Sequence, residues 1–352
     1  MKKYYTRVCN FYYGITSKKL IKNKKALPLG GNKSISFDHI EILSRNSSKL
    51  IHINHINNLS SKFRKKIKKD LKAISRRKKN FANLNFDKLP NIMGVLNLTP
   101  DSFSDGGKYN KKKLSGKRAL KLFKSGSNLI DIGGESTRPY SKEIEPINEW
   151  KRIKLTLQKL KKKKIPISVD TRKSYVMEKS IELGAKLIND ISGLTFDKNT
   201  IKIIKKNKIP FVLHHSQGKP QTMQKNPKYK NVLFDIYDYF EERLKFIRLN
   251  GIKHNNIILD PGIGFGKNLK HNITLISKIS IFHSLGFPVL IGVSRKSFIK
   301  AIAGKNDTKE RLGGTIGSSL FAIMQGIQVL RIHDVNEVIQ SIKIFKKLLN
   351  HK

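Results

Sequence analysis

The sequence is poor in cysteine and in acidic residues, and it contains no long apolar run. One cysteine among 352 residues, Cys9, excludes an internal disulfide framework and suits a reducing compartment. No apolar stretch approaches the ~18 residues that a membrane span requires. The first residues, MKKYYTRVCNFYYG, have neither the apolar core nor the small-residue cleavage site of a signal peptide. We therefore expect a cytoplasmic protein that is not secreted.

The scarcity of acidic residues leaves a formal net charge of +47, from 72 Lys and Arg against 25 Asp and Glu. A charge of this size invites a nucleic-acid interpretation. The excess is spread along the whole chain, however, and Lys, Asn and Ile are abundant together, which indicates a bias at tolerant surface positions. Residues 1–87 are the most basic part, with 22 Lys and Arg against 4 Asp and Glu. We expect a solvated surface there, with an RNA or membrane-surface role as the alternative.

Residues 1–87 differ from the rest and are expected to form a basic N-terminal extension, either a small α+β unit or partly flexible. Residues 36–43 (SFDHIEIL) are the one strand predicted there. Residues 60–79 are basic and amphipathic, with apolar residues at spacings of four, four and three, which is one helical face: Phe63, Ile67, Leu71 and Ile74. We predict a helix that docks on the main domain by this face, with membrane or nucleic-acid contact as the alternatives.

From residue 90 the chain alternates short apolar runs with longer amphipathic ones. The short runs predict eight strands, at 91–96, 129–132, 165–169, 186–188, 209–213, 256–259, 288–292 and 328–332. The longer runs predict helices, for example at 146–161, 174–183, 200–206, 233–250, 273–282, 315–325 and 335–349. Eight strands separated by helices indicate an α/β fold, a (β/α)8 TIM barrel over residues 88–352. An open doubly wound sheet is the alternative, since strand number alone does not show closure.

Polar residues stand where each predicted strand ends. They are Asn97, Asp131, Asp170, Asn189, His214 with His215, Asp260, Ser294 with Lys296, and Arg331 with His333. The carboxyl ends of the strands in a parallel barrel meet at one rim, where active sites are built. Polar groups gathered there must be satisfied by each other or by a ligand. We therefore predict a site at this rim, although Asp131 alone could also cap its strand.

These residues fall into two chemical groups. Carboxylate and amide groups suit an aminopyrimidine-like ring that presents several N–H donors, and they belong to Asp170, Asn189 and Asp260. Cationic groups suit an anionic leaving group such as a diphosphate, and they belong to Arg138 in the loop GGESTRP and to Lys296, Arg331 and His333. The pattern indicates a substrate with a nitrogen heterocycle at one end and phosphates at the other.

Other catalytic arrangements are not indicated. No Ser–His–Asp or Cys–His pair has a suitable spacing, and no Cys/His cluster suggests zinc. His214 and His215 are adjacent on a strand, so at most one of them faces the site. Asn97 and the carboxylates of the loop after it offer the oxygen ligands that Mg²⁺ prefers.

Seven motifs in order resemble dihydropteroate synthase, the pterin-binding barrel family of folate biosynthesis. They are MGVLNLTPDSFSDGG, IDIGGESTRP, SVDT, INDISG, LDPGIGFGK, SRKSFI and VLRIHDV, and they cover roughly residues 90–350. The resemblance implies a (β/α)8 barrel that is usually a homodimer. It also implies the condensation of 4-aminobenzoate with (7,8-dihydropterin-6-yl)methyl diphosphate, which gives 7,8-dihydropteroate and diphosphate with Mg²⁺.

The resemblance further implies roles for residues matched motif by motif. Asn97 would be the Mg²⁺ ligand. Asp170, Asn189, Asp260 and Lys296 would hold the pterin, with Arg331 and His333 on the diphosphate. Thr137, Arg138 and Pro139 would lie on a loop that closes with the 99–107 loop over the site. Phe103, Pro139, Lys296 and Ser297 would line the aminobenzoate pocket. The catalytic set would be Asp170, Lys296 and Arg138.

Three departures from the family pattern stand out. Tyr140 follows STRP where the family usually has Gly, HHSQG at 214–218 replaces a Met–His–Met-like run, and the extension is absent from most members. A pterin-binding methyltransferase domain is the nearest alternative, but it has no use for the cationic leaving-group site. An inactive pterin-binding paralogue would lack a catalytic position, and none is missing. An RNA-associated protein would need an RNA-binding motif, which the extension does not show.

Overall fold

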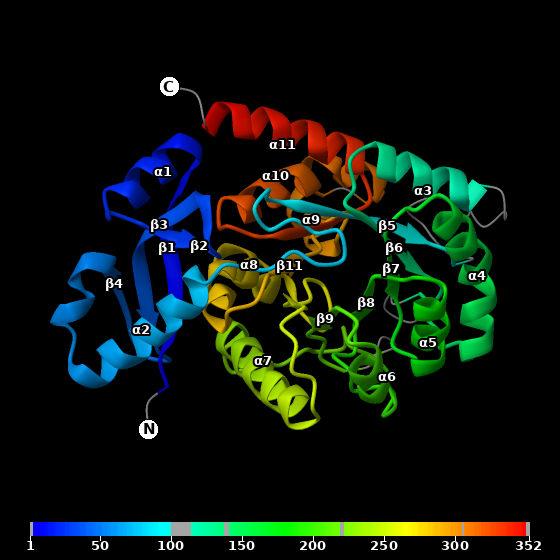
Figure 1. Cartoon of the computed structure of the whole chain (residues 1–352), viewed down its shortest axis with the longest axis horizontal. Helices are drawn as coiled ribbons and strands as arrows, with labels where there is room; N and C mark the ends of the chain where they lie inside the picture. The colour runs from blue at the N-terminus through cyan, green and yellow to red at the C-terminus, as the bar shows by residue number, and fades with distance from the viewer. Residues whose placement is uncertain (1–2, 100–113, 137–140, 219–221, 305, 350–352) are drawn as a thin grey trace.

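The computed structural model describes residues 3–99, 114–136, 141–218, 222–304 and 306–349. A small sheet with two helices, built from the extension, lies beside a larger barrel wrapped in helices (Figure 1). In the described part of the chain, none of the helices combines the length and the apolar character needed to cross a bilayer.

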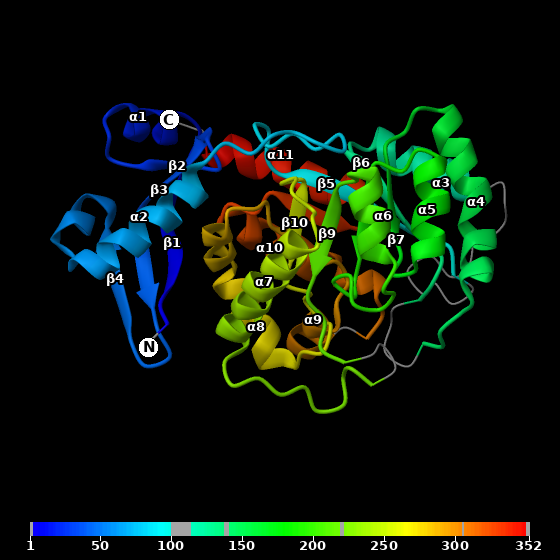
Figure 2. The ribbon, with the colours of Figure 1, turned by 60° about the horizontal axis from the view of Figure 1, so that its bottom comes forward.

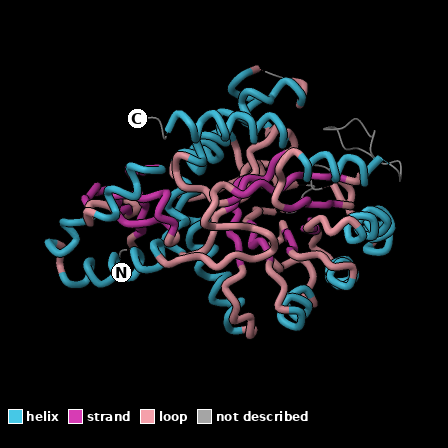
Figure 3. Tube along the Cα trace, turned by 45° about the horizontal axis from the view of Figure 1, so that its top comes forward, coloured by secondary structure: helices cyan, strands magenta, loops and turns pink. Residues whose placement is uncertain are grey.

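The barrel consists of eight parallel strands, which Figure 3 shows enclosed by helices. In chain order they are β5 (Asn91–Asn97), β6 (Leu129–Gly133), β7 (Ile167–Asp170), β8 (Leu187–Asp190), β9 (Phe211–His214), β10 (Ile257–Asp260), β11 (Leu290–Ile291) and β12 (Val329–Ile332). Their order in the sheet runs from β10 through β9, β8, β7, β6, β5 and β12 to β11. A parallel bridge between Leu259 and Val289 joins the two ends. This closure confirms the predicted barrel over the open sheet.

Helices follow the strands in alternation. They are α3 (Leu114–Lys124), α4 (Pro146–Lys162), α5 (Ser174–Glu182), α6 (Thr200–Asn207), α7 (Val232–Leu249), α8 (Leu269–Ser277) with η2 (Ile279–Leu285), α9 (Ser297–Ala303), η3 (Lys309–Arg311), α10 (Leu312–Ile323) and α11 (Val335–Leu349). The predicted helix 273–282 is wrong in its bounds. The capping box of Asn268 and His271 starts α8 earlier, and Lys278, with φ −125° and ψ 25°, ends it before η2.

The barrel strands read as apolar runs because both of their faces are covered, one by the barrel interior and the other by helices. Ile130, Val169 and Leu213 are fully buried, for example. A strand with no solvent-facing side leaves only its ends for polar groups. Polar strand ends therefore mark the rim of this fold.

The extension holds more regular structure than the sequence predicts. Its elements are β1 (Tyr5–Tyr13), α1 (Gly14–Lys22), β2 (Leu27–Leu29), β3 (Asn32–Leu43), β4 (Ser48–His52), η1 (Ile53–Asn58) and α2 (Ser61–Ser75). The strands form an antiparallel sheet in the order β1-β3-β2, with β4 also paired to β3. The expectation of a single strand is wrong. Asn10 has φ +55° within β1, and this break hides the strand's alternation.

The apolar face of α2 is buried, as predicted, at Ile67, Leu71 and Ile74, while Phe63 packs edge-on against Tyr4. Ile67, Leu71 and Ile74 share one core with the sheet of the extension and with the amino-terminal ends of the barrel strands. Leu84 and Phe86, which precede β5, also lie in that core. The helix thus packs both on its own sheet and toward the barrel.

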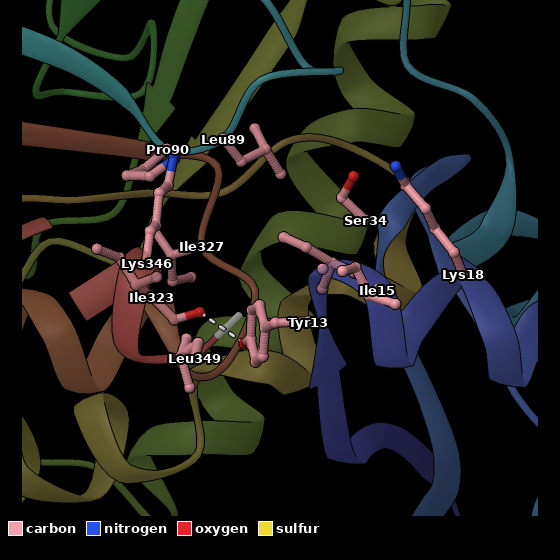
Figure 4. Close-up of a pocket in the computed structure, with 12 residues that line it drawn as sticks. Tyr13, Ile15, Lys18, Ser34, Leu89, Pro90, Ile323, Ile327, Lys346 and Leu349 are labelled. Carbon is pink, nitrogen blue, oxygen red and sulfur yellow. Dashed lines mark hydrogen bonds between the residues drawn. The ribbon is translucent and has the colours of Figure 1, made fainter. Parts of the chain in front are cut away.

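Specific contacts fix the extension to the outside of the barrel. Tyr5 stacks on Phe234 of α7, with ring centroids 4.3 Å apart, and its hydroxyl donates to Asp238 at 3.1 Å. Tyr13 donates to the Ile323 carbonyl at 2.8 Å and borders an apolar cavity of about 340 Å³ between the two parts (Figure 4). The last turn of α11 lies beside α1 in both ribbon views (Figures 1 and 2).

Candidate active site

A cavity of about 590 Å³ opens at the carboxyl ends of the barrel strands. Its volume is typical of small-molecule sites. The predicted residues that line it are Asn97, Asn189, His214, Asp260, Ser294, Lys296, Ser297, Arg331 and His333. Phe103, Thr137, Arg138, Pro139 and Tyr140 lie outside the described residues. The rim therefore brings together most of the predicted site residues that the structure describes.

A buried carboxylate pair, Asp131 and Asp170, forms a floor behind the lining residue Arg331, and neither carboxylate is itself among the residues that line the cavity. Arg331 donates through Nε to Asp131 and through Nη2 to Asp170, each at 2.7 Å. Asp131 also accepts from Ser168 at 2.6 Å and from the Asn189 amide at 3.1 Å. Asp131 is thus the centre of a hydrogen-bond network, more than a strand cap. Asp170 is linked to the cavity through this shared arginine.

Asn189 leaves one polar atom ready for a ligand. Its Nδ2 is occupied by Asp131, whereas its buried Oδ1 has no hydrogen-bond partner among the described residues. A buried acceptor without a partner is costly, so it favours an N–H donor from a molecule in the cavity.

Burial controls the titration of the two other acceptors. It raises the pKa of Asp170, against the opposing charge of Arg331. It also raises the pKa of Asp260 to about 6, although the backbone N–H of Gly262 and the charge of Lys296 lower it. The Asp260 carboxyl, which lines the cavity, can therefore hold or share a proton with a bound ligand near pH 6.

The turn after β10 requires a glycine. Gly262 has φ +69°, and a Cβ there would lie 2.0 Å from the His215 carbonyl oxygen. Its N–H donates to Asp260 at 2.8 Å and fixes that carboxylate. His214 borders the cavity, with its ring 3.9 Å from Asp260, while His215 faces Tyr239 and Lys267 instead. The prediction that only one of the two histidines faces the site is confirmed.

Cationic residues also line the cavity. Lys296 Nζ lies 4.2 Å from the centre of the Phe265 ring, and burial together with the charge of Arg331 lowers the pKa of this ammonium to about 8. The backbone N–H of His333 donates to Ser294 Oγ at 3.2 Å, so this hydrogen bond joins the segments that follow β11 and β12. Arg295 and Arg311 also line the cavity.

Sequence reasoning missed Phe265, Arg295 and Arg311 as cavity residues. The motif SRKS places Arg295 next to Lys296, and this adjacency could have indicated its position. Arg311 lies in η3, which does not directly follow a barrel strand, so the pattern of polar strand ends could not predict it. Its position depends on how the connection between α9 and α10 folds back.

The described residues offer little to hold a metal by themselves. Among them, no three His, Cys, Asp or Glu side chains converge on one point. Asn97 lines the cavity and supplies one neutral oxygen beside Gly133 and Asp170. Such a donor fits Mg²⁺ that is held mainly by water and substrate phosphates.

The amino-acid sequence is similar to that of known proteins. Residues 93–333 match the pterin binding enzyme family. The chain is 38% identical over 264 residues to the dihydropteroate synthase of Escherichia coli K12, covering 75% of this chain and 93% of that protein. It is 40% identical over 254 residues to the dihydropteroate synthase of a Synechocystis species, covering 72% and 88%. The chain belongs to the dihydropteroate synthase family.

Solved structures of this family share the fold. A Yersinia pestis dihydropteroate synthase in complex with a sulfonamide drug matches with a TM-score of 0.73 at 37% identity, over 76% of this chain and 97% of that one. A Xanthomonas albilineans dihydropteroate synthase with 4-aminobenzoic acid matches with a TM-score of 0.71 at 32% identity, over 76% and 96%. The family resemblance read from the seven motifs is confirmed, as is the barrel.

Proposed function

We propose that this chain condenses 4-aminobenzoate with (7,8-dihydropterin-6-yl)methyl diphosphate to give 7,8-dihydropteroate and diphosphate. One observation carries the proposal. A single cavity brings together buried acceptors, from Asn189 and Asp260, and the cations of Lys296 and Arg331. This arrangement matches a substrate with a hydrogen-bond-donating ring and an anionic tail. The family membership supplies the chemical identity of that substrate.

The pterin ring lies, in this proposal, against the floor. Asp260, Asn189 Oδ1 and Asp170 accept its N–H groups, and Lys296 donates to a ring acceptor. Arg331 holds Asp170 and Asp131 at 2.7 Å, so the carboxylates are oriented before the substrate binds. Because these carboxylates are already oriented, substrate binding requires little reorientation of the site and loses little free energy to it.

The reaction exchanges one bond for another. The C–O bond between the pterin methylene and the diphosphate breaks, and the diphosphate leaves with the bonding electron pair. The amine of 4-aminobenzoate forms the new C–N bond with its lone pair and then releases a proton to solvent. Electron density from the pterin ring and the negative floor stabilise the cationic methylene. Arg331 and His333 stabilise the charge that develops on the leaving group.

The aminobenzoate pocket and the loop residues complete the proposal. Lys296 and Ser297 line one wall of the described cavity. Phe103, Thr137, Arg138 and Pro139, which lie outside the described residues, are assigned here from the family motifs alone. Arg138 then joins Asp170 and Lys296 in the catalytic set.

Asn97 is proposed as a ligand of magnesium. When bound, Mg²⁺ neutralises charge on the diphosphate and so makes it a better leaving group. Asn97 is the one described residue proposed as its protein ligand, so we expect the metal to arrive largely with the diphosphate.

Three further proposals concern the domain organisation, the assembly and the location of the protein. Residues 88–352 are proposed as the pterin-binding barrel and residues 1–87 as a small α+β extension whose core continues into the barrel. A homodimer is proposed because Phe321 and Met324, three residues apart on α10 and at its end, are about half exposed; a monomer in sedimentation would contradict it. A cytoplasmic location is proposed from the single cysteine.

The test is product formation by the purified full chain. Incubation with both substrates and Mg²⁺ should give dihydropteroate, detected by chromatography and mass spectrometry. Lys296→Ala should weaken the binding of both substrates while leaving the circular dichroism spectrum unchanged. A folded wild-type sample without turnover would overturn the proposal. Methyl transfer from a folate donor to a methyl acceptor, with no dihydropteroate formed, would favour the pterin-binding methyltransferase instead.

A further inference from the structure

The residue before Lys296 has an unusual backbone. Arg295 has φ +58°, in the left-handed region that residues other than glycine seldom adopt. Lys296 is the N-cap of α9 and Ser297 is its first residue. The turn at Arg295 therefore sets the direction in which both of these cavity residues leave the chain.

Three anchors hold the Arg295 turn from different sides. Its N–H donates to Thr315 Oγ1 at 3.0 Å. Its carbonyl accepts from Arg311 Nη1 at 3.0 Å. Its guanidinium pairs with Asp334, with Nε 2.8 Å from Oδ2. Thr315 and Arg311 are buried, so these anchors belong to the packed interior between α10 and the rim.

The same anchors connect two cationic segments of the site. Asp334 directly follows His333, whose N–H donates to Ser294 at 3.2 Å. Residues 294–295 after β11 are thus bound to residues 333–334 after β12 by one backbone–side-chain bond and one ion pair. A shift of either segment would be transmitted to the other.

A left-handed arginine persists only where its surroundings fix it, and such strained residues gather at functional sites. An ion pair that served stability alone would form equally well on a relaxed backbone. We propose that Asp334, Arg311 and Thr315 are positioning residues, which hold Arg295 left-handed and so place Lys296 and Ser297 in the cavity in register with His333. This inference rests on the proposed function for its kinetic consequence, and its geometric consequence stands apart from it.

The kinetic test uses Asp334→Asn and Thr315→Val, two isosteric changes at different anchors of one turn. Neither Asp334 nor Thr315 is among the described residues that line the cavity. Each variant should lower kcat/KM by about 10- to 100-fold, the usual result of a small misplacement of catalytic groups. The double variant should lose little more than the worse single variant, because both release the same turn. Additive losses would contradict the proposal, as would unchanged kinetics.

Matched controls separate positioning from general damage. Thr315→Ser keeps the hydroxyl and should restore wild-type kinetics. Glu182→Gln breaks the exposed pair with Lys179 on α5 and should change nothing. If Thr315→Ser is as poor as Thr315→Val, the hydroxyl bond to Arg295 is not the cause.

A crystal structure of Asp334→Asn tests the geometry without any activity. Arg295 should leave the left-handed region, and Lys296 Nζ should leave its place 4.2 Å from the Phe265 ring centre. Should that variant fail to fold, Thr315→Val should show the same displacement. An unmoved Lys296 would overturn the inference whether or not the wild type makes dihydropteroate. If Lys296 is displaced in the variant but the folded wild type shows no turnover, the positioning role stands and the proposed function fails.

Discussion

Replacement of Arg331 by Met should destabilise the protein strongly and in a pH-dependent way. Arg331 is the shared donor of Asp131 and Asp170, whose side chains are 0% and 7% exposed. Removing one partner of a buried ion pair costs about 3–5 kcal/mol, because the remaining charge has no compensation. We expect a loss of this size in the free energy of unfolding of Arg331→Met at pH 8. A protein's total stability is only about 5–15 kcal/mol, so the loss is easily measured.

The pH dependence distinguishes lost charge from lost packing. Burial already raises the pKa of Asp170, and without Arg331 that pKa should rise further. A carboxyl with a raised folded-state pKa costs nothing below its unfolded value and costs most above its folded value. The deficit of Arg331→Met relative to the wild type should therefore shrink by about 1–3 kcal/mol between pH 8 and pH 5.5.

Urea unfolding followed by circular dichroism at both pH values makes this measurement. Lys179→Met, which breaks an exposed pair with Glu182, is the control and should behave as the wild type. A deficit below about 1 kcal/mol at pH 8 would refute the argument. A large deficit that does not change with pH would show that packing, and not charge, is responsible.

Three other predictions address the cation, the metal and the extension. Burial lowers the pKa of Lys296 to about 8, so kcat/KM should fall as the pH rises through 8. In Lys296→Arg this fall should disappear, because the guanidinium stays protonated. A profile of kcat/KM against pH from 6 to 9.5 tests both expectations. Asn97→Ala should raise the Mg²⁺ concentration for half-maximal rate about tenfold, and an unchanged titration would remove Asn97 as a ligand. Tyr5 is buried against Phe234, so Tyr5→Ala should lower the free energy of unfolding by about 3 kcal/mol and Tyr5→Phe by about 1 kcal/mol. If urea unfolding gives equal losses for the two variants, the stacking of the Tyr5 ring does not stabilise the protein.

The barrel could be predicted from the sequence because its signal is local. A strand buried on both faces, such as β9, reads as a short apolar run, and its polar end marks the rim. The position of each end along the chain was enough to gather Asn189, Asp260 and Lys296. No contact between distant residues had to be known.

The hydrogen bonds of the floor could not be predicted in this way. Arg331 and Asp131 are 200 residues apart, and their 2.7 Å contact depends on β12, β5 and β6 pairing in sequence around the barrel. Asp131 consequently looked like a strand cap. The left-handed turn at Arg295 was hidden for the same reason, because its anchors come from α10 and from the segment after β12.

The extension was the least predictable part. Its strand β1 lacks regular alternation at Asn10, and its docking rests on single contacts such as Tyr5 with Phe234. A sequence shows that an aromatic residue is present but does not show which distant ring it meets. Composition drew attention to charge in residues 1–87, whereas burial of residues such as Tyr5 and Ile67 fixes the extension in place.

The central claim is that one cavity joins the two substrates and releases diphosphate. Its most direct test is a simultaneous measurement of diphosphate and dihydropteroate made by the purified full chain with Mg²⁺. The account predicts equal amounts of the two products, both dependent on added 4-aminobenzoate and both greatly reduced in Lys296→Ala. Diphosphate released without dihydropteroate, or no product from a folded sample, would contradict it.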